Sequence, residues 1–245
     1  MQVGVQLYTL RDTLDQDLDG GLKRISELGF RFVETAGFYD LSPEALRDKF
    51  DANGLVAVAS HTGLDAIEAD LAKVVSDSKA LGLGLVVVPW ISADAYEGRW
   101  EEIASRLNGV GATLADEGIR LAYHNHDFEF KADNGIVPME FFADHLDPEA
   151  VGFEIDLAWV AHAGQNPVEW IEKLADQIDV LHMKDVTVDG QLADVGKGKV
   201  DWDAVLAAAA DAGITSGLIE HDNPGDAFAS ISASKAFLES KGCTF

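Results

Sequence analysis

The chain has 245 residues, of which 47% are hydrophobic and 25% are charged, so it can bury a sizeable core and is not intrinsically disordered. Its charge is one-sided, because 18 basic residues face 43 acidic ones and give a formal net charge of −25 at pH 7. Nucleic acid and anionic membrane surfaces are therefore excluded as partners. The same excess of carboxylates predicts a halophilic surface, adapted to high ionic strength.

The cysteine content and the termini bear on the cellular compartment. Cys243 is the single cysteine and cannot form an internal disulfide. The initial segment MQVGVQLYTLRD lacks the basic and apolar regions of a signal peptide, and no apolar run approaches the roughly 20 residues that span a bilayer. We therefore expect a cytoplasmic protein. Its length lies near the upper limit for one hydrophobic core, which predicts a single domain over residues 1–245.

Short apolar runs rich in β-branched residues predict strands along the whole chain. The eight runs are residues 3–9, a run near residue 32, and residues 55–61, 85–90, 119–126, 151–156, 180–185 and 217–221. Amphipathic stretches lie between them and predict helices, among them residues 18–28, 65–81, 100–118, 167–178 and 203–213. Glycines after Leu28, Glu117 and Ala212 are typical of helix ends, and Ser42-Pro43 and Asn166-Pro167 of helix starts.

The alternation of strand and helix defines the fold class. One strand and one helix recur every 25 to 40 residues or so, which predicts a parallel sheet. Eight such units in about 250 residues match a (β/α)₈ TIM barrel. A doubly wound open sheet is the alternative, although the first strand-to-helix turn has no G-x-G-x-x-G motif.

Polar residues gather at the carboxyl ends of the expected strands, where barrel active sites are built. They are Gln6, Tyr8, Glu34, His61, Trp90, His124, Asn125, His126, Glu129, Glu154, Asp156, His182, Lys184, Asp185, Glu220, His221 and Asp222. Because side chains alternate along a strand, His124 and His126 share a face, as do Glu154 and Asp156. Imidazoles and carboxylates that converge from four strands predict one divalent cation, which could be Mn²⁺, Zn²⁺, Co²⁺, Fe²⁺ or Mg²⁺.

The ordered segments YHNHDFEF, FEIDLAWV, VLHMKD, GKGKVDW and LIEHD resemble the sugar phosphate isomerase/epimerase family, the xylose isomerase-like TIM barrels. The resemblance covers essentially the whole chain. It implies one divalent metal, with Asp156, His182 and Glu220 as three of its ligands. His124 stands in the fourth ligand position, where family members commonly carry a glutamate that also serves epimerases as one of two bases. Its replacement puts epimerisation by two carboxylates in doubt.

The resemblance implies proton abstraction next to the carbonyl of a keto sugar or polyol derivative, through an enediolate that the metal stabilises. Glu220 is the first candidate for the base. Lys184 is expected to stabilise a developing oxyanion, or else to form an ion pair with Asp185, Asp156 or Glu154. His126 or His61 is the candidate second acid or base.

Further residues are expected around this centre. Those expected to contact the substrate are Gln6, Glu34, Trp159 and Lys197; Trp159 either stacks on a sugar ring or caps the barrel. Glu154 is expected to hydrogen-bond a metal-bound histidine. Glu129 is expected to turn out of the site, and the alternative for His61 is a loop hydrogen bond near Asp65.

Three other functions fit the same fold. A metal-dependent lyase or dehydratase on an inosose-like or keto-sugar substrate is the main alternative, since elimination can proceed with one base. A metal-dependent endonuclease is disfavoured by the acidic composition, and a non-catalytic sugar-binding barrel by the presence of Asp156, His182 and Glu220. Few cationic side chains lie near the predicted mouth of the barrel, which favours an unphosphorylated sugar or polyol. Arg11 leaves open a substrate that carries a carboxylate or phosphate group. A homo-oligomer is also left open.

Overall fold

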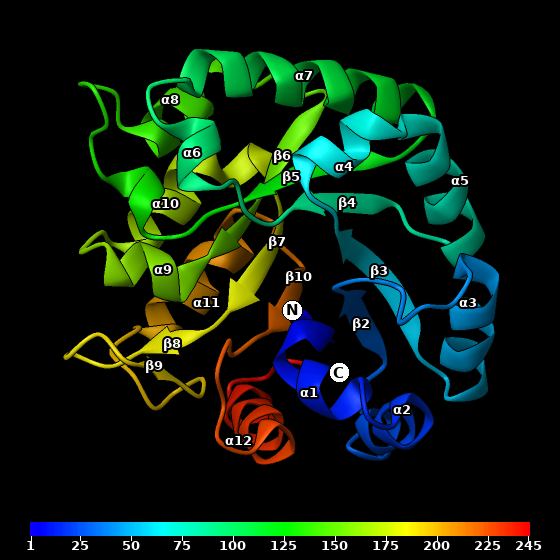
Figure 1. Cartoon of the computed structure of the whole chain (residues 1–245). Helices are drawn as coiled ribbons and strands as arrows, with labels where there is room; N and C mark the ends of the chain where they lie inside the picture. The colour runs from blue at the N-terminus through cyan, green and yellow to red at the C-terminus, as the bar shows by residue number, and fades with distance from the viewer.

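The computed structural model describes residues 1–245, apart from the side chains of residues 93 and 94. In this part of the chain eight parallel strands close into a barrel with helices around its outside (Figure 1). The strand order is β1-β10-β7-β6-β5-β4-β3-β2, and pairing of Val5 with Ile219 joins the first strand to the last. The termini lie side by side, since Gln2 pairs with Thr244 (Figure 1). The predicted TIM barrel is confirmed.

The barrel strands are β1 (Gln2–Gln6), β2 (Phe32–Thr35), β3 (Val56–His61), β4 (Leu85–Val88), β5 (Arg120–His124), β6 (Val151–Asp156), β7 (Ile178–Met183) and β10 (Ser216–Ile219). A short antiparallel pair, β8 (Asp185–Val186) and β9 (Leu192–Ala193), follows β7. Five expected strands run past the observed strand ends, namely those over residues 3–9, 85–90, 119–126, 180–185 and 217–221. The first ends at Gln6, whose side chain accepts a hydrogen bond from the Tyr8 N–H and begins a 3₁₀ helix. Pro89 follows β4 and has no N–H for the sheet, and the N–H of His126 after β5 donates to Glu129 instead.

The helices are α1 (Arg11–Leu14), α2 (Leu18–Glu27), α3 (Pro43–Ala52), α4 (Leu64–Ala69), α5 (Leu71–Leu81), α6 (Ala93–Tyr96), α7 (Trp100–Asp116), α8 (Pro138–His145), α9 (Leu157–His162), α10 (Pro167–Leu174), α11 (Trp202–Asp211) and α12 (Ala227–Ser240). The start signals are confirmed, because Ser42 caps α3 and Asn166 caps α10. The single helix expected over 65–81 is two helices, since the Asp70 carboxylate accepts from the Lys73 N–H and starts α5.

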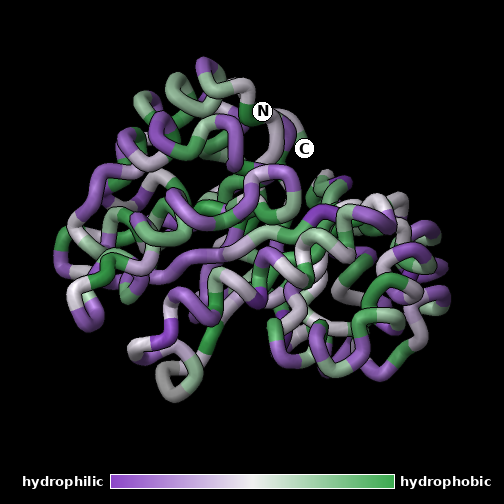
Figure 2. Tube along the Cα trace, turned by 90° about the horizontal axis from the view of Figure 1, so that it is seen from above, coloured by the Kyte–Doolittle hydropathy of each residue, from purple (hydrophilic) through white to green (hydrophobic). Residues whose placement is uncertain are grey.

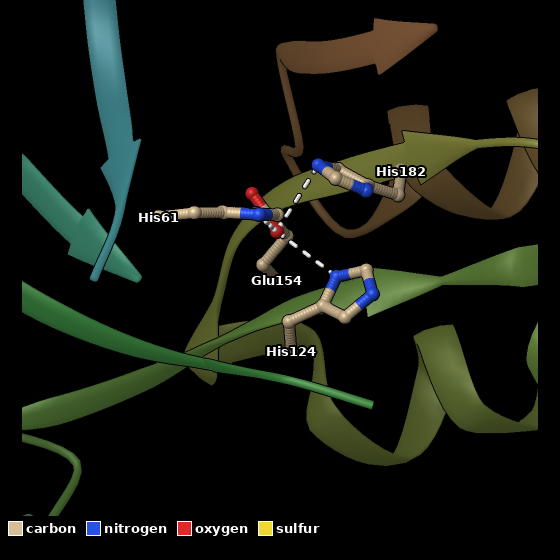
Figure 3. Close-up of side chains that lie close together, drawn as sticks. All are labelled: His61, His124, Glu154 and His182. Carbon is tan, nitrogen blue, oxygen red and sulfur yellow. Dashed lines mark hydrogen bonds and ion pairs between the residues drawn. The ribbon is translucent and has the colours of Figure 1, made fainter. Parts of the chain in front are cut away.

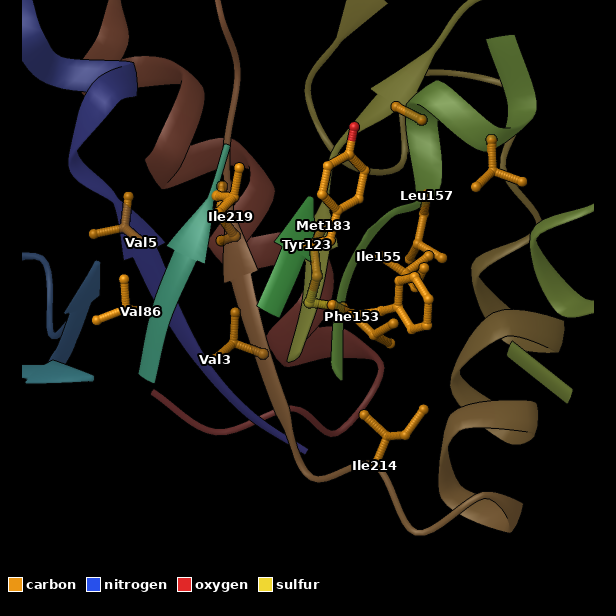
Figure 4. Close-up of a cluster of buried hydrophobic side chains, with 14 of the residues drawn as sticks. Val3, Val5, Val86, Tyr123, Phe153, Ile155, Leu157, Met183, Ile214 and Ile219 are labelled. Atoms are coloured by element: carbon orange, nitrogen blue, oxygen red, sulfur yellow. The ribbon is translucent and has the colours of Figure 1, made fainter. Parts of the chain in front are cut away.

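The main core lies between the barrel and its helices. Outward-facing strand residues such as Val86, Tyr123 and Phe153 are fully buried there or nearly so (Figure 4). Hydrophobic and hydrophilic residues alternate along the helices, as expected for helices with one face on the barrel (Figure 2). Inside the barrel, Ala59, Val87 and Ala122 pack together. Within the described residues, no helix combines the length and the hydropathy that a membrane span needs.

Candidate metal centre

Buried polar side chains converge inside the barrel at the carboxyl ends of the strands. Each of the following is at most 4% exposed: Gln6, Glu34, His124, Glu154, Asp156, His182, Lys184 and Glu220. The strand register places His124 opposite Glu154 and Asp156 opposite His182. Charged groups buried this deeply need partners of opposite charge.

One part of this cluster is built around a single carboxylate oxygen of Glu154. We call it the deeper part, because Glu154 lies two residues before Asp156 in β6 and is thus further from the carboxyl end of that strand. Oε2 of Glu154 lies 2.9 Å from Nε2 of His61, 2.9 Å from Nδ1 of His124 and 3.0 Å from Nε2 of His182 (Figure 3). Oε2 of Glu34 lies 2.8 Å from Nε2 of His182 and 3.5 Å from Nε2 of His61. Glu34 is thus fully buried against two histidines.

The outer part is organised by Lys184. Its Nζ lies 2.7 Å from Oε2 of Glu220, 2.9 Å from Oδ2 of Asp156 and 3.0 Å from Oδ1 of Asp222. Of the ion pairs considered for Lys184, the one with Asp156 is confirmed. The carboxylate of Asp185 has other partners, because it accepts hydrogen bonds from backbone N–H groups and from Trp202.

Four residues of the cluster fit a divalent cation, and we call them the outer set: His124, Asp156, His182 and Glu220. Each offers one ligand atom, and these atoms lie within 4.8 Å of one another. Nδ1 of His182 is 2.9 Å from Glu220, and Nε2 of His124 is 3.9 Å from Asp156. Mixed imidazole and carboxylate ligands suit Zn²⁺, Mn²⁺, Co²⁺ or Fe²⁺.

The pKa values within the cluster shift in different directions, because burial and the neighbouring carboxylates act on each group differently. Burial raises the pKa of Asp156 to about 6, and burial together with the Glu154 charge raises the pKa of Glu34 to about 7. Burial opposes protonation of His182, yet the carboxylates of Glu154 and Glu220 raise its pKa well above the ordinary value. Burial holds the pKa of His124 well below its ordinary value, so its ring is neutral and keeps a lone pair for a cation.

A cavity of about 520 Å³ opens above the cluster, within the usual size range of small-molecule sites. Its lining residues are Tyr8, Ala36, His61, Pro89, Trp90, His124, His126, Lys184, Glu220 and Asp222. Tyr8 and Trp90 are 41% and 55% exposed. Two aromatic rings therefore remain accessible beside the candidate ligands.

Glu129 lies elsewhere than expected. It is fully buried, and it accepts a hydrogen bond of 2.8 Å from the Tyr123 hydroxyl and another of 2.8 Å from the backbone N–H of His126. The expectation that it turns out of the site is wrong, because both carboxylate oxygens have donors inside the fold. Burial raises the pKa of Glu129 to about 7. The loop hydrogen bond considered for His61 is also wrong, since Asp65 pairs with Arg106.

The residues expected to contact the substrate are dispersed. Gln6 is buried at the end of β1. Trp159 lies at the edge of the cluster, where its backbone N–H donates to Oδ1 of Asp156 and its ring centroid is 5.5 Å from that of His126. Lys197 lines a separate hollow together with His221 and Asp226.

One feature beside the site was not predicted from the sequence. The Asp185 carboxylate accepts hydrogen bonds from the backbone of Gly196 at 3.0 Å and Val200 at 3.1 Å, and from Nε1 of Trp202 at 2.9 Å. It thereby fixes the loop that carries Lys197. The aspartate of HMKD, followed by GKGKVDW, is the signal that could have shown this pairing.

The sequence model of the xylose isomerase-like TIM barrel family matches residues 22–240. The chain therefore belongs to this family. Among solved structures, a sugar phosphate isomerase/epimerase from Parabacteroides distasonis superposes with a TM-score of 0.87 over 97% of both chains, at 21% identity. The IOLI protein with a bound zinc atom superposes with a TM-score of 0.75 over 98% of this chain and 97% of its own, at 18% identity. At these identities the likeness shows the fold.

Curated relatives include inosose dehydratases. The protein from Clostridium botulinum (strain Alaska E43 / Type E3) is 29% identical over 93 residues, which cover 37% of this chain and 30% of that protein. The protein from Bacillus anthracis is 27% identical over 106 residues, or 42% of this chain and 33% of that one. The chain thus spans about a third of the length of these relatives. The family thus includes sugar-modifying enzymes such as inosose dehydratases.

Proposed function

We propose that this protein is a divalent-metal-dependent sugar isomerase or epimerase that removes the proton next to the carbonyl of a keto sugar or polyol derivative. The observation that carries the proposal is the outer set. Its four side chains come from the neighbouring strands β5, β6 and β7 and from the end of β10. Three of them lie at no more than 2% exposure, and His124 and Glu220 line the cavity of about 520 Å³.

The outer set would hold the cation, which when bound polarises the substrate's carbonyl oxygen. Glu154 supports this role of the histidines. It accepts from Nδ1 of His124 and Nε2 of His182, the ring nitrogens opposite those that face Asp156 and Glu220. Such carboxylate contacts set the tautomer and orientation of a metal-binding imidazole.

Glu220 is the proposed base. Its carboxylate lines the cavity, so breaking the substrate's C–H bond can pass the proton to an oxygen of Glu220. Lys184 lies 2.7 Å from that carboxylate and presents an ammonium to the oxyanion that develops as the carbonyl gains electrons. His126 lines the same cavity and can bind a substrate hydroxyl.

The charges around the cavity favour an unphosphorylated substrate. Among the residues that line it, Lys184 is the permanently cationic side chain, and three carboxylates already surround it. A phosphate would therefore meet Glu220 and Asp222 without a free counter-charge. The exposed rings of Tyr8 and Trp90 suit the C–H face of a sugar or cyclic polyol instead.

A lyase or dehydratase acting on an inosose-like or keto-sugar substrate is the second candidate. The match to inosose dehydratases favours it. The family resemblance also favours it, because it implies that His124 replaces a second carboxylate base. The first step would be the same proton abstraction. The neighbouring hydroxyl would then leave as water, taking up the proton that Glu220 has removed.

Proton NMR in D₂O with metal-loaded protein tests the proposal. The substrates are a panel of unphosphorylated keto sugars and inososes, each beside its phosphorylated counterpart. We expect loss of the signal of the proton next to the carbonyl of an unphosphorylated compound. An isomeric product identifies an isomerase or epimerase, and an unsaturated or dicarbonyl product identifies a lyase. Absence of exchange across the whole panel would contradict both candidates.

A further inference from the structure

Three imidazole nitrogens from three strands meet at one point inside the barrel. Nε2 of His61, Nδ1 of His124 and Nε2 of His182 all lie 2.9–3.0 Å from Oε2 of Glu154 (Figure 3). This point is lined by different ring nitrogens from those that face Asp156 and Glu220. It is thus a separate place in the fold from the outer set.

The spacing of the rings matches that of ligands on one cation. The ring centroid of His61 lies 5.5 Å from that of His124 and 5.5 Å from that of His182. The centroids of His124 and His182 are 4.7 Å apart. A tetrahedral zinc ion, with nitrogens at about 2.0–2.1 Å, holds imidazole centroids roughly 5 Å apart. Little movement of the three rings is therefore needed for them to bind one ion.

One oxygen of each carboxylate at this point lacks a partner among the described residues. Glu34 and Glu154 are fully buried, and Oε1 of each has no hydrogen-bond partner among the described residues. An unsatisfied carboxylate oxygen at zero exposure is costly. A cation held by these nitrogens, with Oε2 of Glu154 as its fourth ligand, would bring positive charge to both buried carboxylates.

We propose that His61, His124, His182 and Glu154 form a deep cation position that prefers zinc. Its ligand atoms lie within 4.8 Å of one another. Three nitrogens with one carboxylate favour Zn²⁺, whereas the second carboxylate of the outer set makes that set more suitable for Mn²⁺. His61 lines the cavity, which gives an ion a way in.

The two positions exclude one another, because His124 and His182 belong to both. Each ring turns one nitrogen to the deep position and the other to the outer set. A neutral imidazole has one lone pair and one N–H, so each ring serves one position at a time. The protein therefore binds one equivalent of cation, and zinc in the deep position displaces manganese from the outer set. The exclusion rests on the proposed function; the deep position itself does not.

Anomalous diffraction on crystals of metal-free protein soaked in either zinc or manganese chloride locates each ion. We expect the zinc peak at about 2.0–2.1 Å from the nitrogens of His61, His124 and His182, and the manganese peak between Asp156 and Glu220. A zinc peak at the outer set with His61 unbound overturns the deep position and leaves the proposed function standing. Ordered metal at neither place overturns both.

Zinc and manganese titrations followed by calorimetry provide the solution test. We expect His61→Gln to weaken zinc affinity at least tenfold and to change manganese affinity less than threefold. Asp156→Asn should weaken manganese affinity at least tenfold and change zinc affinity less than threefold. His162→Gln is the matched control, since its ring pairs with Asp127 on the same side of the barrel. Circular dichroism of the metal-free variants verifies folding. Wild-type zinc affinity in His61→Gln would show that the deep position is wrong.

Discussion

Nε2 of His182 in β7 lies 2.8 Å from Oε2 of Glu34 in β2, although 148 residues separate the two in the chain. This contact ties a candidate metal ligand to a carboxylate of a strand on another side of the barrel. Glu34 was expected to touch substrate, yet it is fully buried against His182 and His61. Its position fits a role in orienting the two imidazoles.

Replacement of His182 by alanine should abolish metal binding, because its ring faces both the outer set and the deep position. We expect one equivalent of divalent cation in the wild-type protein after dialysis against micromolar metal, and none in the variant. Metal at a hundredfold excess over its Kd should raise wild-type stability by about 2.7 kcal/mol. Elemental analysis and thermal unfolding measure both effects. His145→Ala, on the surface of α8, is the control; metal retained in His182→Ala would contradict the assignment.

Glu220→Gln should slow proton abstraction while leaving a ligand oxygen in place. We expect solvent deuterium exchange into substrate to fall by roughly 10²–10⁴-fold, measured by NMR at equal metal content. Glu239→Gln on the surface of α12 should exchange at the wild-type rate. Exchange at that rate in Glu220→Gln would show that another group is the base.

Lys184→Met should destabilise the metal-free protein strongly. The ammonium is 1% exposed and contacts Asp156, Glu220 and Asp222, so its removal leaves buried carboxylates uncompensated. We expect a loss of about 3–5 kcal/mol in the free energy of unfolding, measured by urea denaturation. Saturating cation should reduce the loss. Lys173→Met removes a surface ion pair with Glu140 and should cost no more than about 1 kcal/mol; equal losses in the two variants would refute the argument.

Glu129 should make stability depend on pH. Burial raises its pKa from 4.5 to about 7, so the folded protein keeps a proton that the unfolded chain releases. The resulting stabilisation is fully present below pH 4.5 and is lost as pH rises through 7. Relative to Glu129→Gln, the wild-type free energy of unfolding should fall by about 3 kcal/mol across that window. Parallel pH profiles of the two proteins, from urea denaturation, would contradict the prediction.

Salt should stabilise the protein, because the excess carboxylates that give its net charge of −25 repel one another. This repulsion is screened more strongly as ionic strength rises. We expect the melting temperature to increase between about 0.1 M and about 1 M potassium chloride, where the Debye length shortens from about 10 to 3 Å. A melting temperature that stays constant or falls would argue against the halophilic surface.

We further propose that residues 1–245 are one domain, so calorimetry should show one cooperative transition.

The sequence by itself determined the barrel, and it predicted all four residues of the outer set as metal ligands. Apolar runs and amphipathic stretches alternate along the chain, and such periodicities are local signals that need no knowledge of long-range contacts. Asp156 and His182 could be placed at strand ends because those ends lie on one face of a parallel barrel. The helix starts at Ser42 and Asn166 could also be predicted, because a capping residue acts on only the next few residues and is therefore a local signal.

Only the tertiary structure decided which of these side chains meet. The approach of Glu34 to His182, and the convergence of His61 and His124 on Glu154, depend on strand register and barrel closure. The inward turn of Glu129 likewise depends on donors supplied by Tyr123 and His126 once their strand is packed. The physical reason is that the alternation of side chains along a strand determines on which face each one lies. The partner that it contacts on that face belongs to a segment distant in the sequence, so it depends on how the whole chain folds.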